Sequence, residues 1–204
     1  MRTLIHVAVV HSLADFGSLT EQVKESFQRQ FGSQKWKKHL DDVEQFWDQV
    51  HNEILQLNLN WSQVRLYQDG LPVCGRELEI VSQVAALGSK NHQLLLELAH
   101  RGAHLMGTED PALLMEEYAR AKASLSSKGA AQADSQPSGA SGPADDLLRK
   151  RDQFIATMIN QTLREGETGL LFLGMTHCVV QFLAPDIQVR SLVTTSAEKG
   201  QTKL

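Results

Sequence analysis

The stretch that most constrains the fold lies near the C-terminus and reads GLLFLGMTH, from Gly169 to His177. Its apolar residues run without interruption from Leu170 to Leu173, which is typical of a strand buried on both faces, as in a parallel sheet with helices on each side. The run ends at Gly174, and a histidine follows three residues later. Ligands of open parallel sheets bind beyond the carboxyl ends of the strands. The pattern therefore places His177 where a ligand is expected.

The N-terminus repeats this arrangement, because an apolar strand expected over Thr3 to Val10 is followed by His11. Apolar periodicity and glycine stops predict the other elements. Strands are expected over 63–67, 103–106 and 186–193, and helices over 19–31, 33–57, 76–87, 90–101, 111–125 and 145–163. Ser18 and Glu21 have capping-box spacing for the first helix, and Ser89 and Asp110 are expected to cap later ones.

This alternation predicts an α/β fold in a single domain over residues 1–204, with a mostly parallel sheet of about five strands flanked by helices. The consecutive helix pairs, 19–57 and 76–101, either pack on the sheet or form a cover over the crevice at its edge. A Ser-, Gly-, Ala- and Pro-rich segment over 126–144 has no periodic apolar residues and is expected to be a flexible linker. The polar tail from Thr194 onward is expected to fray.

Composition excludes several classes of protein. The 20 Lys and Arg residues against 24 Asp and Glu residues give a net charge of −4, which argues against a nucleic-acid partner. No apolar run approaches the roughly 20 residues that span a bilayer, so no membrane association is expected. Two cysteines without C-x-x-C spacing, and an apolar N-terminus without a cleavage site, indicate a cytoplasmic protein with reduced thiols.

Polar residues at the predicted strand ends are the candidates for a site: His11, Asp15, Asp69, Glu109 and His177. The loops that follow parallel strands converge on one edge of the sheet, so these side chains are expected to lie close together. Two imidazoles with carboxylates suit a divalent ion such as zinc, manganese or iron, which can activate water for hydrolysis. Each residue also has an ordinary role as a turn, cap or loop residue, and taken singly that role is favoured.

Other catalytic arrangements are missing from the sequence. There is no G-x-S-x-G motif and no phosphate-binding loop with Walker spacing. The histidines that fall on helices among charged residues are expected on the solvated surface: His39, His51, His92 and His100.

The stretch from Arg151 to His177, RDQFIATMINQTLREGETGLLFLGMTH, resembles the C-terminal block of the TraB and GumN-like proteins, in which an Arg-containing helix leads into a strand ending Gly-x-x-H. That group is similar to the erythromycin-esterase and ChaN-like proteins, and its Tiki relatives are metal-dependent proteases. A second Gly-x-x-H follows the first strand in the family, and here it reads AVVH, ending at His11 with alanine in place of glycine. The family's acidic position corresponds to Asp69 or Glu109.

These patterns and the resemblance together predict a metal-dependent hydrolase. His11 and His177 are the expected metal ligands, and Asp69 or Glu109 is a further ligand or the general base. Arg151 is expected to hold an anionic substrate group or to orient a carboxylate. The alternative is a non-catalytic ligand-binding or scaffold protein that uses the same crevice. The ligand, a small molecule or a peptide, is not specified by the sequence, which is compatible with a monomer or a homo-oligomer.

Overall fold

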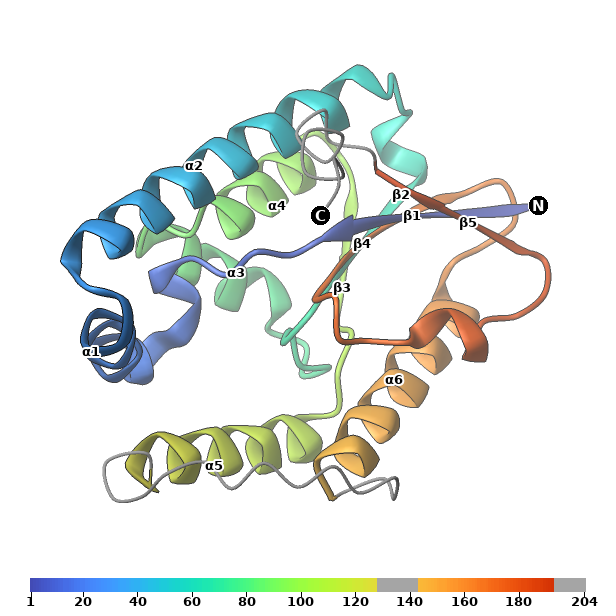
Figure 1. The fold of residues 1–204 in the computed structure, drawn as a ribbon. Helices are drawn as coiled ribbons and strands as arrows, with labels where there is room; N and C mark the ends of the chain where they lie inside the picture. Colours follow the sequence, from blue (N-terminus) through green and yellow to red (C-terminus); the bar gives the residue numbers. More distant parts are fainter. Residues whose placement is uncertain (128–142, 193–204) are drawn as a thin grey trace, which may run out of the picture.

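The computed structural model describes residues 1–127 and 143–192, and its centre is a five-stranded sheet in which every pair of neighbouring strands is parallel (Figure 1). The spatial order is β3-β2-β4-β1-β5. The strands are β1 (Arg2–Ala8), β2 (Val64–Gln68), β3 (His104–Met106), β4 (Thr168–Leu173) and β5 (Ile187–Ser191). The α/β class and the parallel sheet flanked by helices that the sequence predicts are confirmed.

Helices connect the strands. The α-helices are α1 (Thr20–Phe31), α2 (Ser33–Gln56), α3 (Glu77–Ala86), α4 (Lys90–His100), α5 (Pro111–Ser127) and α6 (Pro143–Thr162), with short 3-10 helices η1 (Leu13–Leu19), η2 (Trp61–Gln63) and η3 (Val179–Phe182). No helix in the described ranges combines the length and the apolarity needed to cross a membrane.

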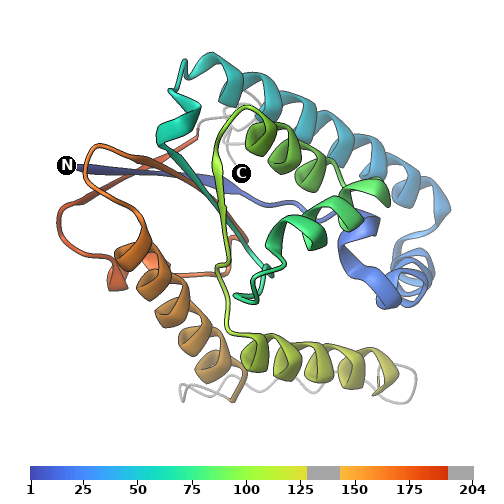
Figure 2. The ribbon, with the colours of Figure 1, turned by 180° about the vertical axis from the view of Figure 1, so that it is seen from behind.

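Two hydrophobic layers cover the sheet, one on each face (Figures 1 and 2). Successive residues of β4 alternate between them: Leu170 and Phe172 pack against α2 and α4, whereas Leu171 and Leu173 pack against α6. Because side chains of a strand point to opposite faces in turn, burial on both faces requires the unbroken apolar run that the sequence shows. Helix α5 lies outside these layers, between α6 and the segment before α1 (Figures 1 and 2).

Two local expectations need correction. Ser18 does not cap α1; the N-cap position is Leu19, no side-chain cap bond is made there, and the capping box forms instead between Ser12 and Asp15 at the start of η1. Ser89 and Asp110 cap their helices as expected. The expected linker is shorter at both ends, since residues 126–127 belong to α5 and 143–144 to α6, and its remainder, with the tail from 194, lies outside the described residues.

The carboxyl ends of β1, β2 and β4 lie at one edge of the sheet, and backbone hydrogen bonds continue past the strand ends there. The N–H of Asp69 donates to the carbonyl of Phe172 at 2.8 Å, and the N–H of Val9 donates to the carbonyl of Leu173 at 3.1 Å. The loops that leave this edge are therefore held in register at their first residues. They carry most of the polar side chains singled out in the sequence.

Candidate functional site

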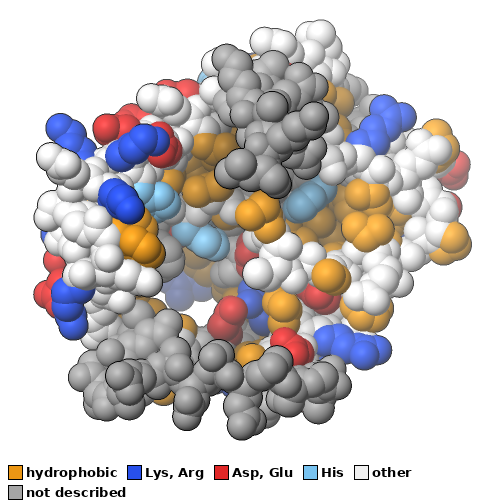
Figure 3. Space-filling view, in the orientation of Figure 1, with side chains coloured by type: hydrophobic (Ala, Val, Ile, Leu, Met, Phe, Trp, Pro, Cys, Tyr) orange, Lys and Arg blue, Asp and Glu red, His pale blue; other side chains and the backbone are white. Residues whose placement is uncertain are grey.

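A cavity of about 330 Å³ opens at the carboxyl edge of the sheet. Its walls come from the loops after β1, β2 and β4 and from residues of helices α3 to α6. In the space-filling view, histidine side chains gather around a hollow on this face, with acidic and basic side chains below them (Figure 3). The cavity thus lies where ligands of parallel α/β folds bind.

Asp69 follows β2 directly and faces the end of β4. Its Oδ2 accepts a hydrogen bond from the backbone N–H of Gly174 at 3.2 Å. A Cβ atom at position 174 would lie only 3.2 Å from this same oxygen, tighter than most real Cβ contacts. Glycine directly after β4 therefore allows the Asp69 carboxylate, which follows the neighbouring strand β2, to approach the backbone closely.

Glu109 is placed by the turn after β3. A Cβ atom at Gly107 would lie 2.7 Å from the Cα of Val73, so only glycine lets the two loops pack this closely. The N–H of Val73 then donates to the Glu109 carbonyl at 2.9 Å. The Glu109 side chain is 0% exposed, and its Oε1 accepts from the N–H of Gly70 at 3.2 Å. The Glu109 side chain, a strand-end candidate in the sequence, is therefore completely buried.

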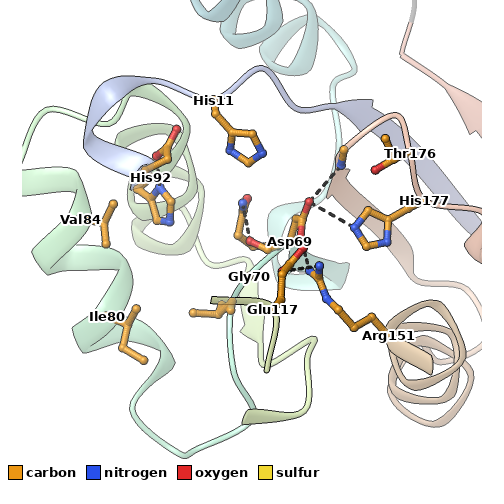
Figure 4. Close-up of a pocket in the computed structure, with 14 residues that line it drawn as sticks. His11, Asp69, Gly70, Ile80, Val84, His92, Glu117, Arg151, Thr176 and His177 are labelled. Carbon is orange, nitrogen blue, oxygen red and sulfur yellow. Dashed lines mark hydrogen bonds and ion pairs between the residues drawn. The ribbon is translucent and has the colours of Figure 1, made fainter. Parts of the chain in front are cut away.

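Arg151, on α6, joins the two carboxylates. Its Nε donates to Glu109 Oε2 at 2.8 Å, and its Nη2 donates to Glu109 Oε1. The same Nη2 donates to Asp69 Oδ1 at 3.0 Å, and Nη1 pairs with Glu117 of α5 (Figure 4). Burial lowers the pKa of this guanidinium, but its acidic partners outweigh burial and raise the pKa above the ordinary value. Burial raises the pKa of Glu109, and Arg151 opposes this rise only in part.

His177 is held by Asp152, the residue after Arg151 on α6. Asp152 Oδ1 lies 2.6 Å from His177 Nδ1, and its Oδ2 accepts the N–H of Cys178 at 2.9 Å. A carboxylate only accepts hydrogen bonds, so Nδ1 carries a proton, and in the neutral form of the ring Nε2 has a lone pair that can bind a cation. Nε2 lies 3.6 Å from Asp69 Oδ2, beyond hydrogen-bond distance (Figure 4).

Asp69, Glu109 and His177 each offer a ligand atom, and these three atoms lie within 4.8 Å of one another. His11, expected as a metal ligand, is not a member of this group in the described part of the chain; it lies on the cavity wall above it (Figure 4). Of the five strand-end candidates, the structure therefore brings together Asp69, Glu109 and His177, with Arg151 between the two carboxylates, and sets His11 and Asp15 apart.

A second polar group lies across the cavity. Ser89 Oγ donates to Asp15 Oδ1 at 2.6 Å and lies 2.8 Å from His92 Nδ1. Burial raises the pKa of Asp15, but hydrogen bonds with His92, Ser89 and Ser12 outweigh it and lower the pKa below the ordinary value. The expectation that His92 is a solvated surface residue is wrong, because its side chain is only 12% exposed and lines the cavity.

In comparisons with protein-family models, with curated proteins and with solved structures, none matched this chain. The function must therefore be argued from the geometry of the site and from the residues themselves.

Proposed function

We propose that the chain is a metal-dependent hydrolase whose site is the group Asp69, Glu109 and His177. The observation that carries the proposal is the approach of Asp69 Oδ2 and His177 Nε2 to 3.6 Å. When the ring is neutral with its proton on Nδ1, both atoms are acceptors, and a positive charge between them, either a bound cation or a second proton on Nε2, relieves their repulsion. A divalent ion bound by a carboxylate oxygen and an imidazole nitrogen meets this requirement.

The charge of the surroundings supports a cation. Four carboxylates and one guanidinium meet at this site, which gives a net charge of −3 when His177 is neutral. Arg151 therefore does not neutralise the carboxylates it binds. A divalent ion reduces the magnitude of this charge in a buried setting, where uncompensated charge is costly.

The residues then have distinct tasks. Asp69 and His177 bind the ion, and Glu109 lies close enough to be the third donor. Asp152 fixes the ring orientation and tautomer of His177 by accepting from Nδ1, an arrangement common around metal-bound histidines. A bound zinc, manganese or iron ion supplies an activated water and polarises a carbonyl. The TraB-like Gly-x-x-H pattern ending at His177 is consistent with this reaction class.

A non-catalytic role for the same crevice is favoured by one observation. Arg151 engages both oxygens of Glu109 and one of Asp69, so much of the group is also satisfied as an internal ion-pair network. In that case the cavity binds a ligand or partner without turnover, and the carboxylates serve to anchor α6.

Metal binding separates the two functions. Untagged protein stripped with a chelator is titrated with Zn²⁺ and Mn²⁺ in a calorimeter, and hydrolysis of model esters and peptides is followed with each metal. We expect one site, lost in His177→Ala and Asp69→Asn and retained in His100→Ala, which removes an exposed histidine of α4. Circular dichroism confirms that each variant is folded. Equal metal affinity in His177→Ala and His100→Ala would exclude the proposed site.

A further inference from the structure

Arg151 has a contact that the proposed metal group does not use. Its Nη1 pairs with Glu117, on α5, while its other nitrogens bind Glu109 and Asp69. The partners differ in exposure: the Glu109 side chain is 0% exposed and that of Asp69 10%, whereas that of Glu117 is 48% exposed. Glu117 is thus the accessible partner of an otherwise buried guanidinium, and it lines the cavity (Figure 4).

The helix that carries Glu117 contributes little to either hydrophobic layer. Between Pro111 and Ser124 no residue of α5 is buried, and Met115 is 66% exposed. Helix α5 contacts α6, and its Tyr118 hydroxyl lies 2.7 Å from Ser18 Oγ. Because packing does not lock this side of the helix, the Glu117 carboxylate can leave Nη1 by side-chain rotation without opening a core.

We propose that Nη1 of Arg151 is a carboxylate-binding subsite of the cavity and that Glu117 holds the place of a ligand carboxylate. The assignment of this subsite to a substrate rests on the proposed hydrolase function. The substrate then bears a carboxylate that replaces the Glu117 carboxylate, and its scissile group lies toward Asp69 and His177. Glu117 is then a competing internal ligand that a substrate must displace.

The charge at the site selects this class of ligand. Exchange of the Glu117 carboxylate for another carboxylate leaves the net charge of −3 unchanged. A doubly charged phosphate adds negative charge beside Asp69 and Glu109, and a neutral amide accepts from Nη1 but brings no negative charge to pair with the guanidinium. A singly charged carboxylate is therefore the group that fits best.

Carboxylate binding is measured by titrating ¹⁵N-labelled, metal-free protein with acetate, and with succinate as a longer acid, at constant ionic strength. Chemical shifts of the Arg151 Nε–H and of the cavity backbone report the position of the ligand. Glu117→Gln removes the competing carboxylate, so its affinity for both acids should rise about fivefold, the factor that corresponds to the loss of one partly exposed ion pair.

Glu116→Gln is the matched control, because Glu116 is the preceding residue of α5 and forms an ion pair with Arg120 one turn along the same helix. Its affinity should equal that of the wild type, and acetamide and inorganic phosphate should bind more weakly than acetate. Equal affinities in Glu117→Gln and Glu116→Gln, no binding at all, shifts confined to sites away from Arg151, or tighter binding of phosphate would each overturn the subsite. Since these titrations contain no metal, they are independent of whether the metal site exists.

Discussion

Replacing Arg151 by methionine tests the site most directly, because it removes the guanidinium and keeps much of the side-chain bulk. Among the described residues, Glu109, whose side chain is 0% exposed, then keeps the N–H of Gly70 at 3.2 Å as its hydrogen-bond donor. Breaking a buried ion pair from one side leaves an uncompensated charge and costs about 3–5 kcal/mol. We expect the free energy of unfolding of Arg151→Met to fall by about this amount.

A divalent ion should restore much of this loss. Without Arg151, the four carboxylates carry a net charge of −4, and Glu109 no longer shares its oxygens with a guanidinium. A unit charge about 4 Å away contributes up to roughly 4 kcal/mol near a protein surface, so the metal affinity should rise by at least about tenfold. At a free metal concentration of 100 times Kd, binding stabilises the folded state by about 2.7 kcal/mol.

The assay is urea unfolding, followed by tryptophan fluorescence, with Zn²⁺ or Mn²⁺ at matched ionic strength. Arg65→Met is the control, since Arg65 forms a largely buried pair with Glu167, through Nη2 at 2.9 Å, at the amino end of β2, the end opposite the cavity. It should be destabilised without recovery on adding metal. If metal stabilises Arg151→Met no more than Arg65→Met, the cavity carboxylates do not form a metal site.

Two further predictions concern His177 and the core. Asp152→Asn removes one of the two acceptor oxygens that hold His177 Nδ1 and the N–H of Cys178. The metal affinity should then fall about 10- to 100-fold with the fold retained. An unchanged Kd in calorimetry would contradict the positioning role of Asp152. Burial raises the pKa of Tyr67 to about 12, against an opposing hydrogen bond from Thr162. Because the unfolded tyrosine ionises near pH 10, the contribution of Tyr67 to stability should be constant below that pH and fall by about 3 kcal/mol as pH rises through 12. A Tyr67→Phe variant should lack this loss in urea unfolding at each pH.

The parallel sheet is predictable from sequence because its signals are local. An apolar run without polar interruption has to be buried on both faces, and β4 shows this pattern from Leu170 to Leu173. Convergence of the strand-end residues follows from the topology of parallel sheets, so Asp69, Glu109 and His177 could be grouped before their distances were known. The glycine of the Gly-x-x-H pattern acquires a physical reason only in the structure, where Asp69 Oδ2 occupies the space beside Gly174.

Residues on helices are harder to assign, because their roles depend on which face of the helix meets the cavity. Asp152 adjoins Arg151 in sequence, yet one binds a histidine of the β4 loop and the other binds carboxylates after β2 and β3. Nothing in the local sequence of α6 separates these tasks. His92 was expected on the surface for the same reason: its charged neighbours in sequence are not its neighbours in space, where Ser89 and Asp15 surround its ring.

Structural stabilisation does not account for the whole group of charges at the cavity. The bidentate pair of Arg151 and Glu109 is enough to anchor α6, and it occupies both oxygens of Glu109. Asp69 and Asp152 add two further carboxylates, and Asp152 binds the imidazole of His177. In the neutral form of that ring, its Nε2 lone pair faces Asp69 Oδ2 at 3.6 Å. Buried groups that oppose each other in this way lower stability unless a further positive charge joins them. The proposed cation between Asp69 and His177 would join these acceptors, as would a second proton on the imidazole, and the response of Arg151→Met to metal distinguishes the two.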